Sequence, residues 1–193
     1  MVGKHATIWA YARGYMARDL PYQLWWMIEQ AEDWHKLFWE DDAKDTPISK
    51  FGDLTHWMAY MADKIWLIIT DNATSQIAGI GWFSDHRSDT ALTSIWIAPL
   101  WRGKWLAREA IELGCEFGYV ELGLKTIQTI TPWPLARNLA QRAGFRTVCR
   151  IPKHCGLPQD VWLLEHVRKG EGTSLPHNPT PSTWGAGEGR EGT

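Results

Sequence analysis

The chain has 193 residues, enough for one domain of ordinary size but not for two. Its residues are 45% hydrophobic and 22% charged, as in an average globular protein, which excludes a wholly disordered or collagen-like chain. The net charge of -2, without a cluster of Lys and Arg, argues against a nucleic-acid partner. The longest apolar runs, such as residues 65–69, are far shorter than the about 20 residues that a membrane crossing needs, so no membrane partner is expected.

The first part of the chain predicts a strand and two helices. Residues 7–13 alternate along the chain and predict a strand. Asp19 and Pro21 predict the start of a helix over residues 20–38, whose apolar side chains recur every three or four residues. A short helix is predicted over residues 53–62.

The remainder predicts a meander of strands followed by alternating helices and strands. The predicted strands are rich in β-branched and aromatic residues and cover residues 64–70, 76–83, 90–98, 125–131, 146–151 and 161–167. The two amphipathic helices cover residues 104–119 and 134–143. A polar loop over residues 84–89 joins two strands of an antiparallel meander. This order of elements predicts a mixed α/β layer fold.

The two ends of the chain differ from the middle. Residues 170–193 are rich in Gly and Pro, with Leu175 and Trp184 as their only large apolar residues. They predict a flexible tail after a domain that spans residues 1–169. Residues 1–11 hold no apolar stretch followed by small residues, so no secretory signal is expected.

The cysteines favour a reducing compartment. Cys115, Cys149 and Cys155 are odd in number and lack the spacing of a disulfide framework, so reduced thiols and a cytoplasmic location are expected. Cys149, His154 and Cys155 lack a fourth ligand at a paired spacing, so no metal site is expected.

An anion-binding motif is predicted between the strand that ends before Pro99 and the helix that follows. The first N–H groups of a helix lack internal partners, and the helix dipole adds positive charge there, which favours a diphosphate. Gly103 allows close approach to the backbone, and Arg102 and Lys104 add positive charge. Pro99 frees neighbouring peptide groups to bind an extended ligand. Taken alone, these residues also fit a solvated turn before an amphipathic helix.

Two segments resemble the GCN5-related N-acetyltransferase (GNAT) family. They are I-x-P-x-x-R-G-K-x-L-A at residues 97–107 and P-L-A-R-N-L-A-Q-R-A-G-F at residues 134–145, and with the order of elements the resemblance covers residues 7–167. It implies an α/β GNAT fold, with a mixed and mostly antiparallel sheet, helices on both faces and splayed central strands. It also implies transfer of an acetyl group from acetyl-CoA to a primary amine of a small molecule or protein, by direct attack in a ternary complex.

The resemblance also implies which residues bind the co-substrate. Main-chain groups before the loop would line the pantetheine arm of acetyl-CoA, at Ile95, Trp96 and Ile97. The loop and the first turn of the helix would hold its diphosphate, at Arg102, Gly103, Lys104, Trp105, Leu106, Ala107 and Arg108.

Four positions depart from the family pattern. Trp105 replaces the usual first loop glycine, and Ala140 occupies the position of a frequent tyrosine that acts as general acid. Trp133 replaces a frequent cofactor-contacting Asn, and Ala136 a frequent small polar residue. Residues 90–98 contain no carboxylate for a general base.

No catalytic residue is therefore assigned. The nearest titratable residues, Asp85, His86 and Asp89, lie in the preceding loop and are expected to be too far from the thioester. Positioning of two reactants supplies about 7–11 kcal/mol of a barrier, whereas acid–base help is worth about 10²–10⁴ in rate. Loss of one acid would therefore slow such an enzyme without abolishing the reaction.

The departures leave other hypotheses open. One is a GNAT-fold protein that no longer catalyses and serves as a binding or structural component, for example of a viral assembly; another is a protein that binds CoA thioesters without an amine. The acceptor and the oligomeric state stay open, a homodimer included. Trp101, Trp105 and Trp133 are expected near the co-substrate groove, where they would shield the thioester, stack on adenine or fill the site.

Overall fold

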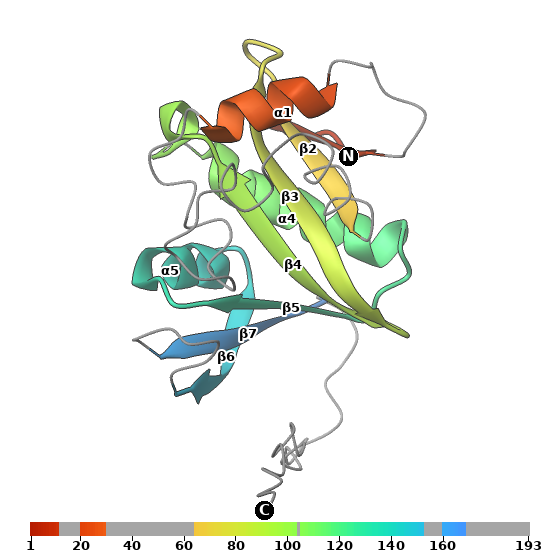
Figure 1. The fold of residues 1–193 in the computed structure, drawn as a ribbon. Helices are drawn as coiled ribbons and strands as arrows, with labels where there is room; N and C mark the ends of the chain where they lie inside the picture. Colours follow the sequence, from red (N-terminus) through yellow and green to blue (C-terminus); the bar gives the residue numbers. More distant parts are fainter. Residues whose placement is uncertain (12–19, 30–63, 104, 153–159, 169–193) are drawn as a thin grey trace, which may run out of the picture.

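The protein is described by a computed structural model that covers residues 1–11, 20–29, 64–103, 105–152 and 160–168 (Figure 1). A seven-stranded sheet has the order β1-β2-β3-β4-β5-β7-β6. Its strands are β1 (Ala6–Tyr11), β2 (Ile65–Asp71), β3 (Ile77–Arg87), β4 (Thr90–Ile97), β5 (Thr126–Thr131), β6 (Phe145–Ile151) and β7 (Val161–Val167). Neighbouring strands are antiparallel except β4 and β5, which are parallel. The sheet is thus mixed and mostly antiparallel, as expected.

Helices cover both faces of this sheet. They are α1 (Leu20–Glu29), α4 (Leu106–Val120) and α5 (Pro134–Arg142), with the short 3-10 helix η2 (Pro99–Trp101) before α4. Figure 1 shows α1 in front of β2, β3 and β4, and α4 behind them. The predicted helix at residues 53–62, the second half of the helix at 20–38 and the tail at 170–193 lie outside the described residues.

Alternation along the strands separates two apolar layers. A Cβ added to Gly114 of α4 would contact Leu67 of β2 and Ile95 of β4 at 3.7 and 3.6 Å, so these two side chains point to α4. Neighbours in sequence point to the opposite face, where Trp66 and Trp82 pack with their ring centroids 4.9 Å apart. The core therefore lies on both sides of the central strands.

The prediction of a polar loop over residues 84–89 was wrong. β3 continues to Arg87, and only Ser88 and Asp89 form the turn to β4. The register shifts between Ser84 and Arg87, and Asp85 adopts a φ of 49°. Polar residues are typical of turns, but here they extend an exposed hairpin, and the irregularity near Asp85 absorbs the change in register.

The two described cysteines differ in environment, and we expect them to differ in reactivity. Cys115 is buried in α4, and burial, helped by the charge of Glu112, raises the pKa of its thiol to about 12. Cys149 is exposed on β6. Because the thiolate is the reactive form, iodoacetamide at pH 8 should label Cys149 and spare Cys115, as read by peptide mapping. Both should be labelled in denaturant; rapid labelling of Cys115 in the folded protein would contradict this expectation.

No helix among the described residues is both long and apolar enough to span a bilayer.

Candidate functional site

A gap opens between the parallel strands β4 and β5. The two strands pair over three residues each, from Thr90 with Thr126 to Leu92 with Gln128. Beyond these pairs β4 continues along β3, and β5 continues along β7. Figure 1 shows the two strands meeting at one end and diverging toward the other. The splayed central strands expected from the sequence are therefore present.

The closed end of the gap is held by Asp89. Its carbonyl oxygen accepts hydrogen bonds from the N–H groups of Lys125, at 2.7 Å, and Thr126, at 3.1 Å. Its exposed carboxylate lies 3.1 Å from the Lys125 ammonium, which lowers the pKa of the Asp89 carboxyl. Because a strand rises about 3.3 Å per residue, Asp89 lies roughly 20 Å along the chain from Ile95. Asp89 therefore joins the strands rather than facing their open end.

The edge of β4 offers main-chain groups to the open part of the gap. Ala98 donates its N–H to the carbonyl oxygen of Ala78 on β3 at 2.9 Å, and the register places Trp96 at the equivalent position two residues earlier. Peptide groups of alternate residues in an antiparallel ladder face opposite edges. Trp96 therefore turns its N–H and C=O to β3, whereas Ile95 and Ile97 turn theirs to the gap.

The first turn of α4 lies beyond the end of β4. The first bond within the helix runs from the N–H of Glu109 to the carbonyl oxygen of Trp105, at 3.1 Å. The N–H groups of Leu106, Ala107 and Arg108 precede this bond, and the first N–H groups of an α-helix have no partner within the helix. Gly103 has a φ of 74°, and a Cβ added there would meet no atom within 4 Å. The loop therefore has open space at Gly103, three residues before Leu106.

This geometry agrees with the comparison to known families. The sequence model of the "Acetyltransferase (GNAT) family" matches residues 28–145, more than half of the chain. The chain belongs to the GNAT family. The predicted family is therefore confirmed. GNAT proteins use acetyl-CoA. No curated protein sequence matches the chain.

Solved GNAT structures share the fold. Spermidine N-acetyltransferase from Vibrio cholerae, in complex with CoA and spermine, has a TM-score of 0.64 and 19% identity, over 84% of this chain and 95% of that chain. A chimera of the same enzyme has a TM-score of 0.61 and 20% identity, over 85% and 96% of the two chains. The form with manganese ions has a TM-score of 0.58 and 19% identity, over 84% and 92%. At these identities the matches show the GNAT fold alone.

Arg102, one of the residues predicted to hold the diphosphate, contacts β4 in the structure. Arg102 donates from Nε to the carbonyl oxygen of Ile97 at 2.8 Å, and its guanidinium lies 5.8 Å from the ring centroid of Trp96. The Arg102 side chain thus occupies one of the main-chain acceptors that β4 turns to the gap. Arg108, in α4, pairs with Glu112 at 2.8 Å, and Lys104 lies outside the described residues.

The three tryptophans expected near the groove have different environments. Trp101 is buried beside β4, and Trp133, which precedes α5, is partly buried with no acceptor for its Nε1–H. Trp105 is 71% exposed. Its indole points to solvent and therefore does not fill the space between β4 and β5. The Nε1–H of Trp96 is also buried without an acceptor.

Candidate acids and bases are scarce among the described residues. Ala140 is buried in α5 and cannot donate a proton from its side chain. Tyr119, at the end of α4, has its hydroxyl 2.8 Å from Nδ1 of His166 and 2.9 Å from the carbonyl oxygen of His166. His166 pairs with Ile127 near the closed end of the gap, so this tyrosine does not replace the missing acid.

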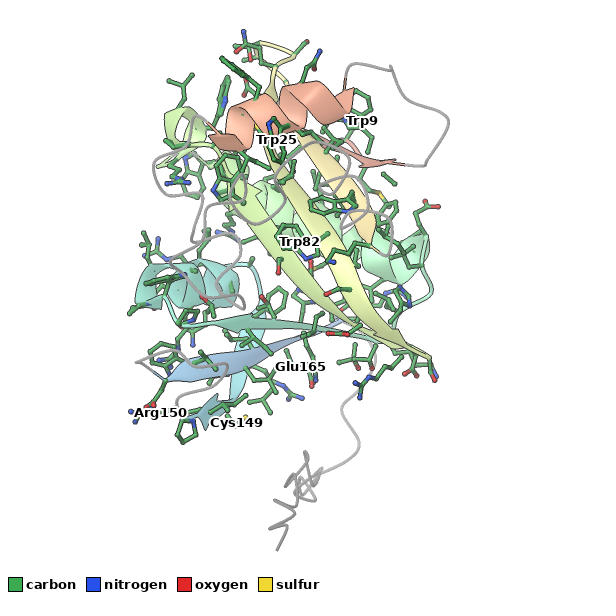
Figure 2. The ribbon with its side chains drawn as sticks, viewed as in Figure 1. Trp9, Trp25, Trp82, Cys149, Arg150 and Glu165 are labelled. Carbon is green, nitrogen blue, oxygen red and sulfur yellow. The ribbon has the colours of Figure 1, made fainter. Side chains whose placement is uncertain are left out.

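Two carboxylates were not singled out from the sequence. Glu165 on β7 pairs with Arg146 at 3.1 Å, and Figure 2 shows it below Trp82 on the viewed side of the sheet. Glu109 on α4 accepts hydrogen bonds from the N–H groups of residues 4–6 at 2.6, 2.6 and 2.8 Å. No local pattern predicts this contact, because its partners are more than 100 residues apart in sequence.

The described residues hold no group of three or more His, Cys, Asp or Glu side chains that would bind a metal ion.

Proposed function

We propose that the protein transfers an acetyl group from acetyl-CoA to a primary amine. The observation that carries this proposal is the gap between β4 and β5, one edge of which offers peptide groups that β3 does not use, next to the first turn of α4. An extended thioester arm needs main-chain partners along its length, and a diphosphate needs N–H donors at its end. The GNAT fold supplies both in the required order.

We assign the binding roles accordingly. The peptide groups of Ile95 and Ile97 bind the pantetheine arm along the edge of β4. The indole of Trp96 points to a face of the sheet rather than to this edge. The diphosphate lies on the loop and first turn, at Arg102, Gly103, Lys104, Trp105, Leu106, Ala107 and Arg108. In this assignment Arg102 releases the carbonyl oxygen of Ile97 when the arm binds, and its guanidinium then turns to the phosphates.

The reaction is a direct displacement in a ternary complex. The nitrogen of a neutral amine attacks the thioester carbonyl carbon, the C–N bond forms, and the C–S bond breaks as the CoA thiolate leaves. The amine loses one proton and the thiolate gains one. Because no tyrosine stands at Ala140, we infer that water passes the proton from the attacking nitrogen, which becomes acidic once the C–N bond forms, to the leaving thiolate. Positioning then provides most of the rate enhancement.

The acceptor is proposed only as a class. The Vibrio cholerae enzyme is named for spermidine and was solved with spermine, which makes polyamines the first amines to test. Amino acids and peptides with a free amine complete the panel.

A second candidate is a GNAT-fold protein that binds or assembles without catalysis. The alanine at position 140 and the bond between Arg102 and Ile97 favour it, because one removes an acid and the other blocks a main-chain acceptor. This candidate does not need acetyl-CoA.

Thermal unfolding with and without acetyl-CoA tests the proposal. A ligand at 100 times its dissociation constant stabilises the folded chain by about 2.7 kcal/mol, which we expect to raise Tm by roughly 5–11 °C. Release of CoA thiol, followed with a disulfide reagent over the amine panel, then separates turnover from binding. Thiol release that depends on an amine supports the enzyme. No shift at millimolar acetyl-CoA supports the structural candidate, and a shift without thiol release supports a protein that only binds CoA.

A further inference from the structure

Trp105 is exposed at a position where the chain departs from its family. Its side chain is 71% exposed, and it lies two residues after Gly103, where an added Cβ would meet no atom within 4 Å. The residue has helical dihedral angles, with φ −62° and ψ −19°, and its side chain makes no capping hydrogen bond to α4. The indole therefore contributes neither to the core nor to the helix cap.

The position of Trp105 next to the first turn of α4 favours contact with the adenine base of CoA. It directly precedes the three first-turn amides to which the proposed function assigns the diphosphate of CoA. In CoA only a ribose separates the diphosphate from the adenine, so a diphosphate on these amides keeps the base within reach of a side chain at this position. Leu100, on η2 of the same loop, is 74% exposed and adds apolar surface.

We propose that the indole of Trp105 stacks on the adenine ring of CoA, an inference that rests on the proposed function. An aromatic side chain offers a flat apolar face, and stacking of a base on such a face does not need a hydrogen bond. The tryptophan thereby makes the protein selective for thioesters of whole CoA over thioesters of the shorter phosphopantetheine.

The test compares two ligands that differ by the adenosine nucleotide. Dissociation constants of CoA and of 4′-phosphopantetheine are measured by titration calorimetry on the full chain and on Trp105→Ala. We expect the substitution to weaken CoA about 10-fold, in the range found for base stacking, and to leave phosphopantetheine unchanged. Trp105→Phe should restore most of the CoA affinity, because a phenyl ring also stacks.

Trp26→Ala is the matched control, since this tryptophan is 64% exposed but lies on α1. It should leave both affinities unchanged. Equal weakening of both ligands in Trp105→Ala would overturn the inference, because the residue would then act on the shared phosphate or on the loop. Unchanged or tighter CoA binding would overturn it too, and tighter binding would mean that the indole obstructs the diphosphate.

The outcomes separate this inference from the proposed function. If the unaltered chain binds CoA and Trp105→Ala binds it equally well, only the stacking inference fails. If the unaltered chain binds neither ligand, the proposed function fails and the stacking inference falls with it.

Discussion

Gly79→Ala is expected to lower the free energy of unfolding by about 3 kcal/mol, near the upper end for overpacked sites. A Cβ at this position on β3 would overlap the main-chain carbonyl oxygen of Trp96 and lie 2.9 Å from Cδ1 of Ile97. A rotamer change cannot move a main-chain oxygen, so β3 and β4 must separate. For a chain of this size the expected fall in Tm is roughly 6–12 °C.

The same substitution should weaken CoA binding, because the displaced atoms belong to the segment of β4 whose other edge carries the peptide groups of Ile95 and Ile97 that face the gap. Gly114→Ala is the matched control. A Cβ there would make ordinary contacts of 3.6 and 3.7 Å, and alanine favours a helix over glycine by about 1 kcal/mol. Thermal unfolding and calorimetric titration with CoA measure both variants. Unaltered Tm and CoA affinity in Gly79→Ala would show that the strands are not in close contact at this point.

Glu109→Gln is expected to destabilise the protein by about 2 kcal/mol, since bonds to a charged acceptor are stronger than neutral ones. The carboxylate of Glu109 accepts from three consecutive N–H groups at the start of β1, at residues 4–6. A side-chain amide keeps only one oxygen, and its NH₂ group faces at least one of these donors. Water replaces part of the loss, because two of the three bonds are exposed.

Glu112→Gln is the control for this prediction. It removes the ion pair between Glu112 and Arg108. Because these side chains are 44% and 43% exposed, the expected loss of stability is at most about 1 kcal/mol. Denaturant unfolding compares the two variants, and hydrogen exchange should show faster exchange at residues 4–6 in Glu109→Gln alone. Equal stability of both variants, with unchanged exchange, would mean that β1 is held without Glu109.

Strong hydrophobic patterns predicted most elements within a few residues. Residues 161–167 were expected to be a strand and form β7, and the amphipathic helix expected from residue 104 begins at Leu106 as α4. Both segments can be recognised locally, because apolar residues recur along them at the spacing of a strand or of a helix face. The hairpin end of β3 has no such signal, since its polar residues are exposed and resemble those of a turn.

The sequence also predicted where the candidate site lies along the chain, but not how its groups are oriented. The loop before α4 carries Pro, Arg and Gly in an order that can be recognised locally, and it led to the family and to acetyl-CoA. The orientation of the Trp96 peptide groups was not predictable, because it depends on the register between β3 and β4. Nor was the exposure of Trp105, since burial depends on what packs around a side chain.

The amino-acid sequence by itself determined the order of most elements and the family, because each depends on neighbours along the chain. Only the tertiary structure decided that Arg102 binds Ile97, that Glu109 binds the start of β1 and that Gly79 touches Trp96. Each of these contacts requires a particular approach of segments in space. That approach is set by packing and register, which no single stretch of sequence encodes.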